Sequence, residues 1–99
     1  MTITTQNENG RLIVAVNGRI DTNTSPQLQS ELLAAFQQNN SITLDLAEVA
    51  YVSSAGLRVL LIAQKTAASK KATFELVNVA PEVMNVLDSV GFSDILVIV

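Results

Sequence analysis

The sequence predicts an α/β fold built on one mixed β-sheet, and three features of the 99-residue chain lead to this prediction. Asn9-Gly10 is a strong tight-turn signal between two short β-prone segments, which predicts an N-terminal hairpin. Apolar residues then recur at helical spacing in three segments, and period-two alternation marks the segments between them. The predicted order is therefore β-β-α-β-α-β-α-β, and helices between strands imply parallel pairing after the hairpin.

The first two predicted strands form the hairpin and cover residues 2–7 and 11–17. We expect the second of them to be a central strand of the sheet, because its apolar residues alternate over the whole segment. These residues should face one way together: Leu12, Val14 and Val16. Polar residues alternate with apolar ones in most strands, so we expect one face of the sheet to be better covered than the other.

The first helix follows a polar loop at residues 22–24. Ser25 has a side chain that suits an N-cap, and Pro26 suits the first helical position. The helix should end by residues 39–40. Its apolar stripe repeats every fourth residue: Leu28, Leu32 and Phe36.

The second half of the chain alternates strands and helices. Strands are predicted at residues 42–46, 73–76 and 94–99, and helices extend to about Ser69 and from Pro81. Gly91 is expected as the C′ residue after the last helix, with Phe92 packed next to it. The expected buried face of the second helix contains Leu57, Leu60, Leu61 and Ala68, and that of the third contains Val83, Val86, Leu87 and Val90.

A small polar corner, Ser53-Ser54-Ala55-Gly56, lies between the third strand and the second helix. We call these four residues the serine corner. Ser53 or Ser54 is placed at or beside an N-cap, where a hydroxyl accepts a hydrogen bond from a free backbone N–H. A helix start also tolerates an anion. Phosphorylation of Ser54 would add a charge of about −1.5 to −2 at a position suited to it.

The stretch LDLAEVAYVSSAGLRVLL, from Leu44 to Leu61, resembles the signature of the STAS domain family. Aligned on Gly56-Leu57, Ser54 takes the place of the serine that is phosphorylated in the bacterial anti-sigma factor antagonists of that family. Ser53 stands where the family usually has aspartate, and Ala55 where it has serine or threonine. Ser53 is the second and weaker candidate for the phosphorylated residue.

The resemblance extends over nearly the whole chain, residues 1–99 forming one STAS domain, and implies a regulator of transcription. The implied partner is an anti-sigma factor that is also a serine kinase, whose binding ends when Ser54 is phosphorylated. The family usually adds a C-terminal helix, which we expect this chain to lack, so that bare apolar surface could support a homodimer. The partner-binding residues implied are Asp21, Thr22, Ser53, Ser54, Ala55, Gly56 and Arg58.

Plainer interpretations of the same residues stay open. Ser54 could be only a helix cap, Asp21 a loop aspartate that bonds its own backbone, and Arg58 a residue of a solvated helix face. The domain could also be an unphosphorylated interaction subunit of a transporter or a signalling scaffold. A small enzyme using Asp21, Asp45 or Glu48 is the third hypothesis, although nothing in the sequence places two of these carboxylates together.

Composition narrows the function further. The net charge is −3 and the six basic residues are scattered, which disfavours nucleic-acid binding. The chain has no cysteine and no histidine, so it offers neither a thiol nucleophile nor the commonest general base and metal ligand. No signal peptide or membrane span is recognisable. We therefore expect a cytoplasmic binding protein with no catalytic residue, cofactor or metal.

Overall fold

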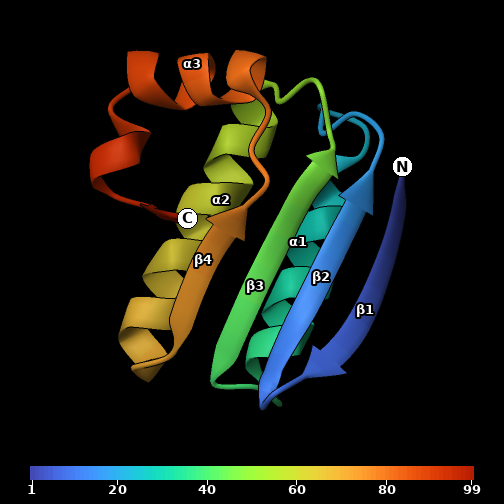
Figure 1. The fold of residues 1–99 in the computed structure, drawn as a ribbon, viewed down its shortest axis with the longest axis vertical. Coiled ribbons are helices and arrows are strands. Elements are labelled where there is room, and N and C mark those ends of the chain that lie inside the picture. The colour runs from blue at the N-terminus through green and yellow to red at the C-terminus, as the bar shows by residue number, and fades with distance from the viewer.

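The computed structural model describes residues 1–99 and contains one five-stranded sheet in the order β1-β2-β3-β4-β5 (Figure 1). β1 (Thr2–Glu8) pairs antiparallel with β2 (Arg11–Asn17). β2, β3 (Ser41–Glu48), β4 (Thr73–Val77) and β5 (Val97–Ile98) then pair parallel, each with the next. The predicted α/β class and element order are confirmed.

Two helices lie along one face of the sheet and a third lies across its end (Figure 1). α1 (Ser25–Phe36) and α2 (Ser54–Lys70) connect β2 to β3 and β3 to β4. α3 (Pro81–Ser89) and a short 3₁₀ helix (Phe92–Asp94) lead from β4 to β5. Each crossover returns the chain to the end of the sheet at which the parallel strands begin, so these strands all finish at the opposite end. The segments that follow β2 and β3 therefore emerge side by side.

The hairpin turn is formed as predicted. Asn9 and Gly10 have φ angles of 53° and 82°, the pair of left-handed residues that a tight two-residue turn needs. β2 is an interior strand with β1 on one side and β3 on the other. Its predicted inward residues are all buried: Leu12, Val14 and Val16.

The sheet face opposite the two helices carries polar side chains, in agreement with the expected difference between its faces. Arg11 pairs with Glu75 at 2.9 Å, and the Thr43 hydroxyl donates to the same carboxylate at 3.2 Å. The Asp45 carboxylate, on the same face, accepts hydrogen bonds from the Ala47 N–H and the Asn78 side chain. The polar residues Arg11, Thr43 and Glu75 thus bond across strands on this face.

α1 begins one residue earlier than predicted. Ser25 is its first helical residue, so that Thr24, and not Ser25, occupies the N-cap position. The Ser25 side chain is buried and donates to the backbone carbonyl of Asp21. Its hydroxyl therefore ties the preceding loop to the helix and does not accept from a helical N–H.

The buried face of α2 also differs from the predicted one. Leu57 and Leu61 are only partly buried and Ala68 is exposed. The residues that face the core are mostly small: Gly56, Val59, Leu60, Ala63 and Ala67. Small residues allow the helix to lie close to the sheet. The spacing of the leucines had indicated a different buried face, rotated about the helix axis from the observed one.

The last predicted strand is reduced to Val97–Ile98. Gly91 adopts a φ of 78° after α3, as expected for a C′ residue, and Phe92 packs against the core. The Phe92 carbonyl then accepts the N–H of Leu96 at 2.8 Å, which continues a turn where a strand starting at Asp94 was predicted. Local hydrogen bonds in this turn replace the ladder of a longer strand.

Several large apolar side chains near the C-terminus are exposed. Val90, predicted on the buried face of α3, is 48% exposed, while Val83 and Leu87 on that helix are buried. The exposed set continues after α3: Ile95, Val97 and Val99. None of the helices combines the length and the hydrophobicity that a membrane crossing needs.

Candidate functional site

The loops after β2 and β3 are joined by backbone hydrogen bonds. The Ile20 N–H donates to the Tyr51 carbonyl at 3.1 Å, and the Ser53 N–H donates to the Ile20 carbonyl at 2.8 Å. Ile20 and Val52 form an isolated parallel bridge. As a result, Asp21 and the serine corner leave the sheet next to each other, at the carboxyl ends of neighbouring parallel strands. Open α/β sheets usually place sites there.

Ser53 is the N-cap of α2. Its backbone is extended, with φ −83° and ψ 175°, and its Oγ accepts the N–H of Gly56 at 3.3 Å. Ser54 is the first helical residue, is exposed, and makes no side-chain hydrogen bond within the chain. The capping role that the sequence left open between the two serines therefore belongs to Ser53, and the hydroxyl of Ser54 is free.

Gly56 lies beneath this surface and not on it. A Cβ at this position would come within 2.8 Å of Cγ1 of Val52 and 3.1 Å of the Ile20 carbonyl oxygen. The residue was expected among those that face a partner, but it is buried. Its part in the site is to let the start of α2 approach the loop after β2.

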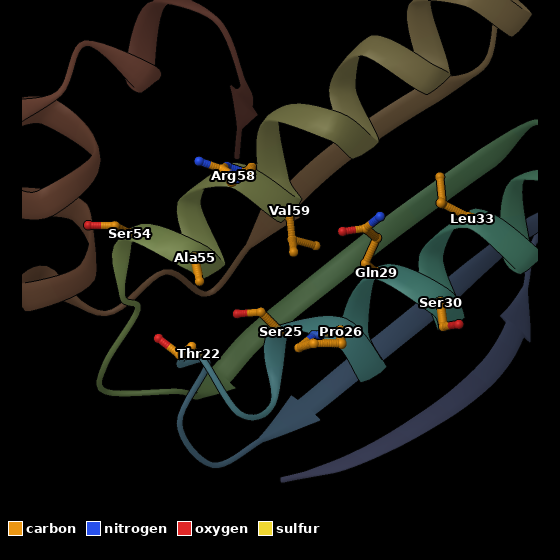
Figure 2. Close-up of a pocket in the computed structure, with 10 residues that line it drawn as sticks. All are labelled: Thr22, Ser25, Pro26, Gln29, Ser30, Leu33, Ser54, Ala55, Arg58 and Val59. Atoms are coloured by element: carbon orange, nitrogen blue, oxygen red, sulfur yellow. The ribbon is translucent and has the colours of Figure 1, made fainter.

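A groove of about 460 Å³ lies between the N-terminal halves of α1 and α2 (Figure 2). Of the residues predicted from the sequence, four line it: Thr22, Ser54, Ala55 and Arg58. The sequence analysis did not predict the other six: Ser25, Pro26, Gln29, Ser30, Leu33 and Val59. Those on α1 lie on the face beside the apolar stripe, and their spacing of three or four residues was the signal that could have revealed them.

Ser54 and Arg58 carry their polar ends on the same side of α2. In Figure 2 the Ser54 hydroxyl and the Arg58 guanidinium both point away from α1. Both residues are exposed. Arg58 is the only charged residue that lines the groove, and the first turn of α2 has no acidic residue. The beginning of α2 is therefore locally positive in a chain whose net charge is −3.

Asp21 bonds to its own loop, as the plainer interpretation proposed. Its Oδ1 accepts the backbone N–H groups of Asn23 and Thr24, each at 3.0 Å, and the Thr24 hydroxyl at 3.1 Å. Arg19 lies 3.8 Å from the other carboxylate oxygen. The backbone hydrogen bond from Thr24 is the largest of the effects that lower the pKa of Asp21 below its usual value. The charged carboxylate thus shapes the loop that enters α1.

Arg19 and Tyr51 form an exposed pair that the sequence analysis did not single out. The guanidinium carbon of Arg19 lies 4.1 Å from the centroid of the Tyr51 ring, the geometry of a cation–π contact. Tyr51 is 42% exposed. Because both residues are next to the hydrogen bonds that join the two loops, the pair borders Asp21 and the serine corner.

The three carboxylates considered for an enzyme have separate surroundings. Asp21 holds its loop, Asp45 is bonded on the open sheet face, and Glu48 is exposed at the end of β3. No group of three or more acidic, histidine or cysteine side chains is arranged to hold a metal ion. The arrangement favours a binding surface formed by the serine corner, the groove and the Arg19–Tyr51 pair.

Comparisons with known proteins agree with this fold. The chain matches the family model described as "Mlab, STAS domain" over residues 3–98. The Bordetella bronchiseptica protein BtrV, named as an anti-sigma factor antagonist, is 32% identical over 96 residues, which cover 96% of this chain and 83% of that protein. An anti-sigma factor antagonist from Mycobacterium paratuberculosis has a crystal structure that superposes with a TM-score of 0.88 at 23% identity, covering 98% of this chain and 83% of that one. The phosphorylated form of the Bacillus cell fate determinant SpoIIAA gives a TM-score of 0.75 at 15% identity, covering 99% and 91% of the two chains.

Proposed function

The chain belongs to the STAS domain family, and we propose that it acts as an anti-sigma factor antagonist. In its unmodified form it binds an anti-sigma factor that is also a serine kinase, and this binding frees a sigma factor. Phosphorylation of Ser54 ends the binding. Support comes from the relative BtrV, whose name contains the words anti-sigma factor antagonist and whose matched region covers 96% of this chain.

The observation that supports the proposed switch is that the two adjacent serines have different roles. Ser53 caps α2, so the Ser54 hydroxyl is exposed and free at the helix start. A phosphate on Ser54 therefore removes no hydrogen bond of the fold, and the partial positive charge of the helix N-terminus favours it. SpoIIAA, which shares this fold, has a solved phosphorylated form.

The change at the surface is electrostatic. A neutral hydroxyl can be covered by a partner at little cost, whereas a phosphate with a charge of about −1.5 to −2 must be desolvated or repelled. The partner kinase supplies ATP and Mg²⁺, so this chain acts by binding and not by catalysis, and needs neither cofactor nor metal. This role places it in the bacterial cytoplasm and requires no contact with nucleic acid or membrane. The proposed contact surface comprises Asp21, Thr22, Ser53, Ser54, Ala55 and Arg58 around the groove.

The test uses candidate anti-sigma factor kinases encoded near the gene for this chain. Purified wild type is incubated with each kinase and ATP, and any phosphate is located by mass spectrometry. We expect the phosphate on Ser54, with Ser53→Ala still modified. Ser54→Ala should bind the partner and resist modification, whereas Ser54→Asp should bind weakly. Equal binding by wild type and both variants would contradict the switch.

A second candidate function keeps the fold and changes the partner. Ser53 stands where the family's kinase substrates usually have aspartate. This departure favours an unphosphorylated interaction subunit of a transporter or a signalling scaffold. Affinity capture that recovers a transporter ATPase and no kinase would support this function over the first.

Self-association is a further part of the proposal. The C-terminal valines Val97 and Val99 are exposed, and β5 is an edge strand of the sheet. Exposed apolar patches of this kind favour contact with a second copy. Sedimentation velocity over a range of concentrations would detect a homodimer, and Val97→Lys should shift it toward the monomer.

A further inference from the structure

Arg58 lies one helical turn after Ser54 on the outer surface of α2. Residues four apart in a helix are neighbours on one face. The polar ends of the two side chains point to the same side of α2 in Figure 2, and both residues are exposed. The guanidinium therefore has space to reach a group carried by the Ser54 hydroxyl.

Arg58 is also the arginine without an acidic partner. Arg11 pairs with Glu75 at 2.9 Å, and Arg19 lies 3.8 Å from Asp21, whereas Arg58 forms no ion pair. The first turn of α2 has no acidic side chain that would compete for it. An anion introduced at position 54 would thus meet an unpaired cation on the same helix face.

We propose that Arg58 holds the phosphate of phosphorylated Ser54 in a clamp within α2. This inference rests on the proposed phosphorylation of Ser54. A guanidinium presents N–H donors in a planar fork that matches two phosphate oxygens, and the free N–H groups at the helix start add further donors. Phosphorylation then changes two surface groups together. The hydroxyl becomes a dianion, and Arg58 turns toward it and is withdrawn from any acidic group of the partner.

The test places phosphoserine at position 54 during synthesis of the full chain, so that it needs neither kinase nor partner. Urea unfolding is measured for wild type and Arg58→Gln, each with serine and with phosphoserine. We expect the phosphate to raise the folding equilibrium constant about threefold more in wild type than in Arg58→Gln. Arg58→Lys should give an intermediate value, because it keeps the charge and loses the planar fork.

Lys65→Gln is the matched control. It removes one exposed cation from α2, but Lys65 lies about 16 Å further along the helix from Ser54, beyond the reach of a phosphate on that residue. Its response to phosphoserine should therefore equal that of wild type. A general effect of net charge would instead make Lys65→Gln behave like Arg58→Gln.

The Arg58 side chain provides a second, direct readout. Its Nε–H resonance in ¹H–¹⁵N spectra should shift and exchange more slowly with water only when residue 54 is phosphoserine. An unmoved resonance together with equal stabilisation of wild type and Arg58→Gln would overturn the clamp, as would unfolding of the phosphorylated chain. The proposed function fails on different evidence, namely a kinase that leaves Ser54 unmodified or a phosphate that leaves partner binding unchanged.

Discussion

Gly56 of α2 packs directly against Ile20 of the loop after β2. A Cβ at position 56 would lie 2.7 Å from Cγ2 of Ile20, closer than two carbon atoms can approach without displacement. Ile20 is completely buried. The start of α2, and with it the direction in which Ser54 is presented, therefore depends on the absence of one methyl group.

Gly56→Ala should destabilise the protein even though alanine is the better helix former. The added methyl group would come within 2.8 Å of the buried side chains of Ile20 and Val52, and such overpacking typically costs about 1–3 kcal/mol. Urea unfolding would measure the loss. Ser54→Ala is the control, since the same residue type placed on the exposed side of the same helical turn should change the free energy of unfolding by less than about 0.5 kcal/mol. A Gly56→Ala variant as stable as wild type would contradict the packing described.

Ser53→Ala should destabilise the fold by removing the cap of α2. Ser53 Oγ accepts the Gly56 N–H, and loss of an N-cap side chain costs about 0.5–2 kcal/mol. Ser53→Asp restores an acceptor at the helix start and should recover most of the loss. If Ser54→Ala were the more damaging of the two alanine substitutions, the assignment of cap and free hydroxyl would be reversed.

Asp21 should make the stability of the protein depend on pH in the acid range. Its pKa is lowered in the folded state, chiefly by the backbone hydrogen bond from Thr24. The carboxylate therefore contributes stability that is fully present above its unfolded pKa of about 3.9 and is lost as the pH falls through the lower folded value. Wild type should lose more stability than Asp21→Asn over this window. A ¹³C titration of the Asp21 carboxyl would check the direction independently, and a folded pKa above the unfolded one would contradict it.

Local patterns in the sequence were sufficient to predict most of the fold. Asn9-Gly10 predicted its turn because few residue pairs adopt two consecutive left-handed conformations. The alternation of apolar residues in β2 predicted which of them are buried. The prediction of the buried face of α2 was wrong because it followed the spacing of the leucines, whereas the close approach of the helix at Gly56 requires small residues on the buried face. Contacts with residues distant in the sequence determine this face, and the local sequence of α2 does not indicate them.

The candidate site divides in the same way. The serine corner was predicted because one continuous segment carries it. The Arg19–Tyr51 pair depends on how two loops meet, and the groove depends on how α1 and α2 lie side by side. No local pattern brings residues from separate segments together. Assignment of the cap between adjacent serines likewise needed the backbone angles of Ser53.

Tyr51→Ala should weaken binding of the anti-sigma factor identified by the kinase experiment. An exposed tyrosine stacked under an arginine beside the serine corner has the composition of an interface hot spot, where truncation commonly costs more than about 1 kcal/mol, or roughly fivefold in Kd. Isothermal titration calorimetry would measure the affinity. Tyr51→Phe keeps the ring beneath Arg19 and should bind nearly as wild type. Val99→Ala is the control at an exposed apolar residue away from the serine corner, and its affinity should equal that of wild type. Unchanged affinity in Tyr51→Ala would confine the contact surface to the groove side of Ser54, because the Arg19–Tyr51 pair lies on the two loops that lead into α1 and α2, whereas the groove lies between these helices.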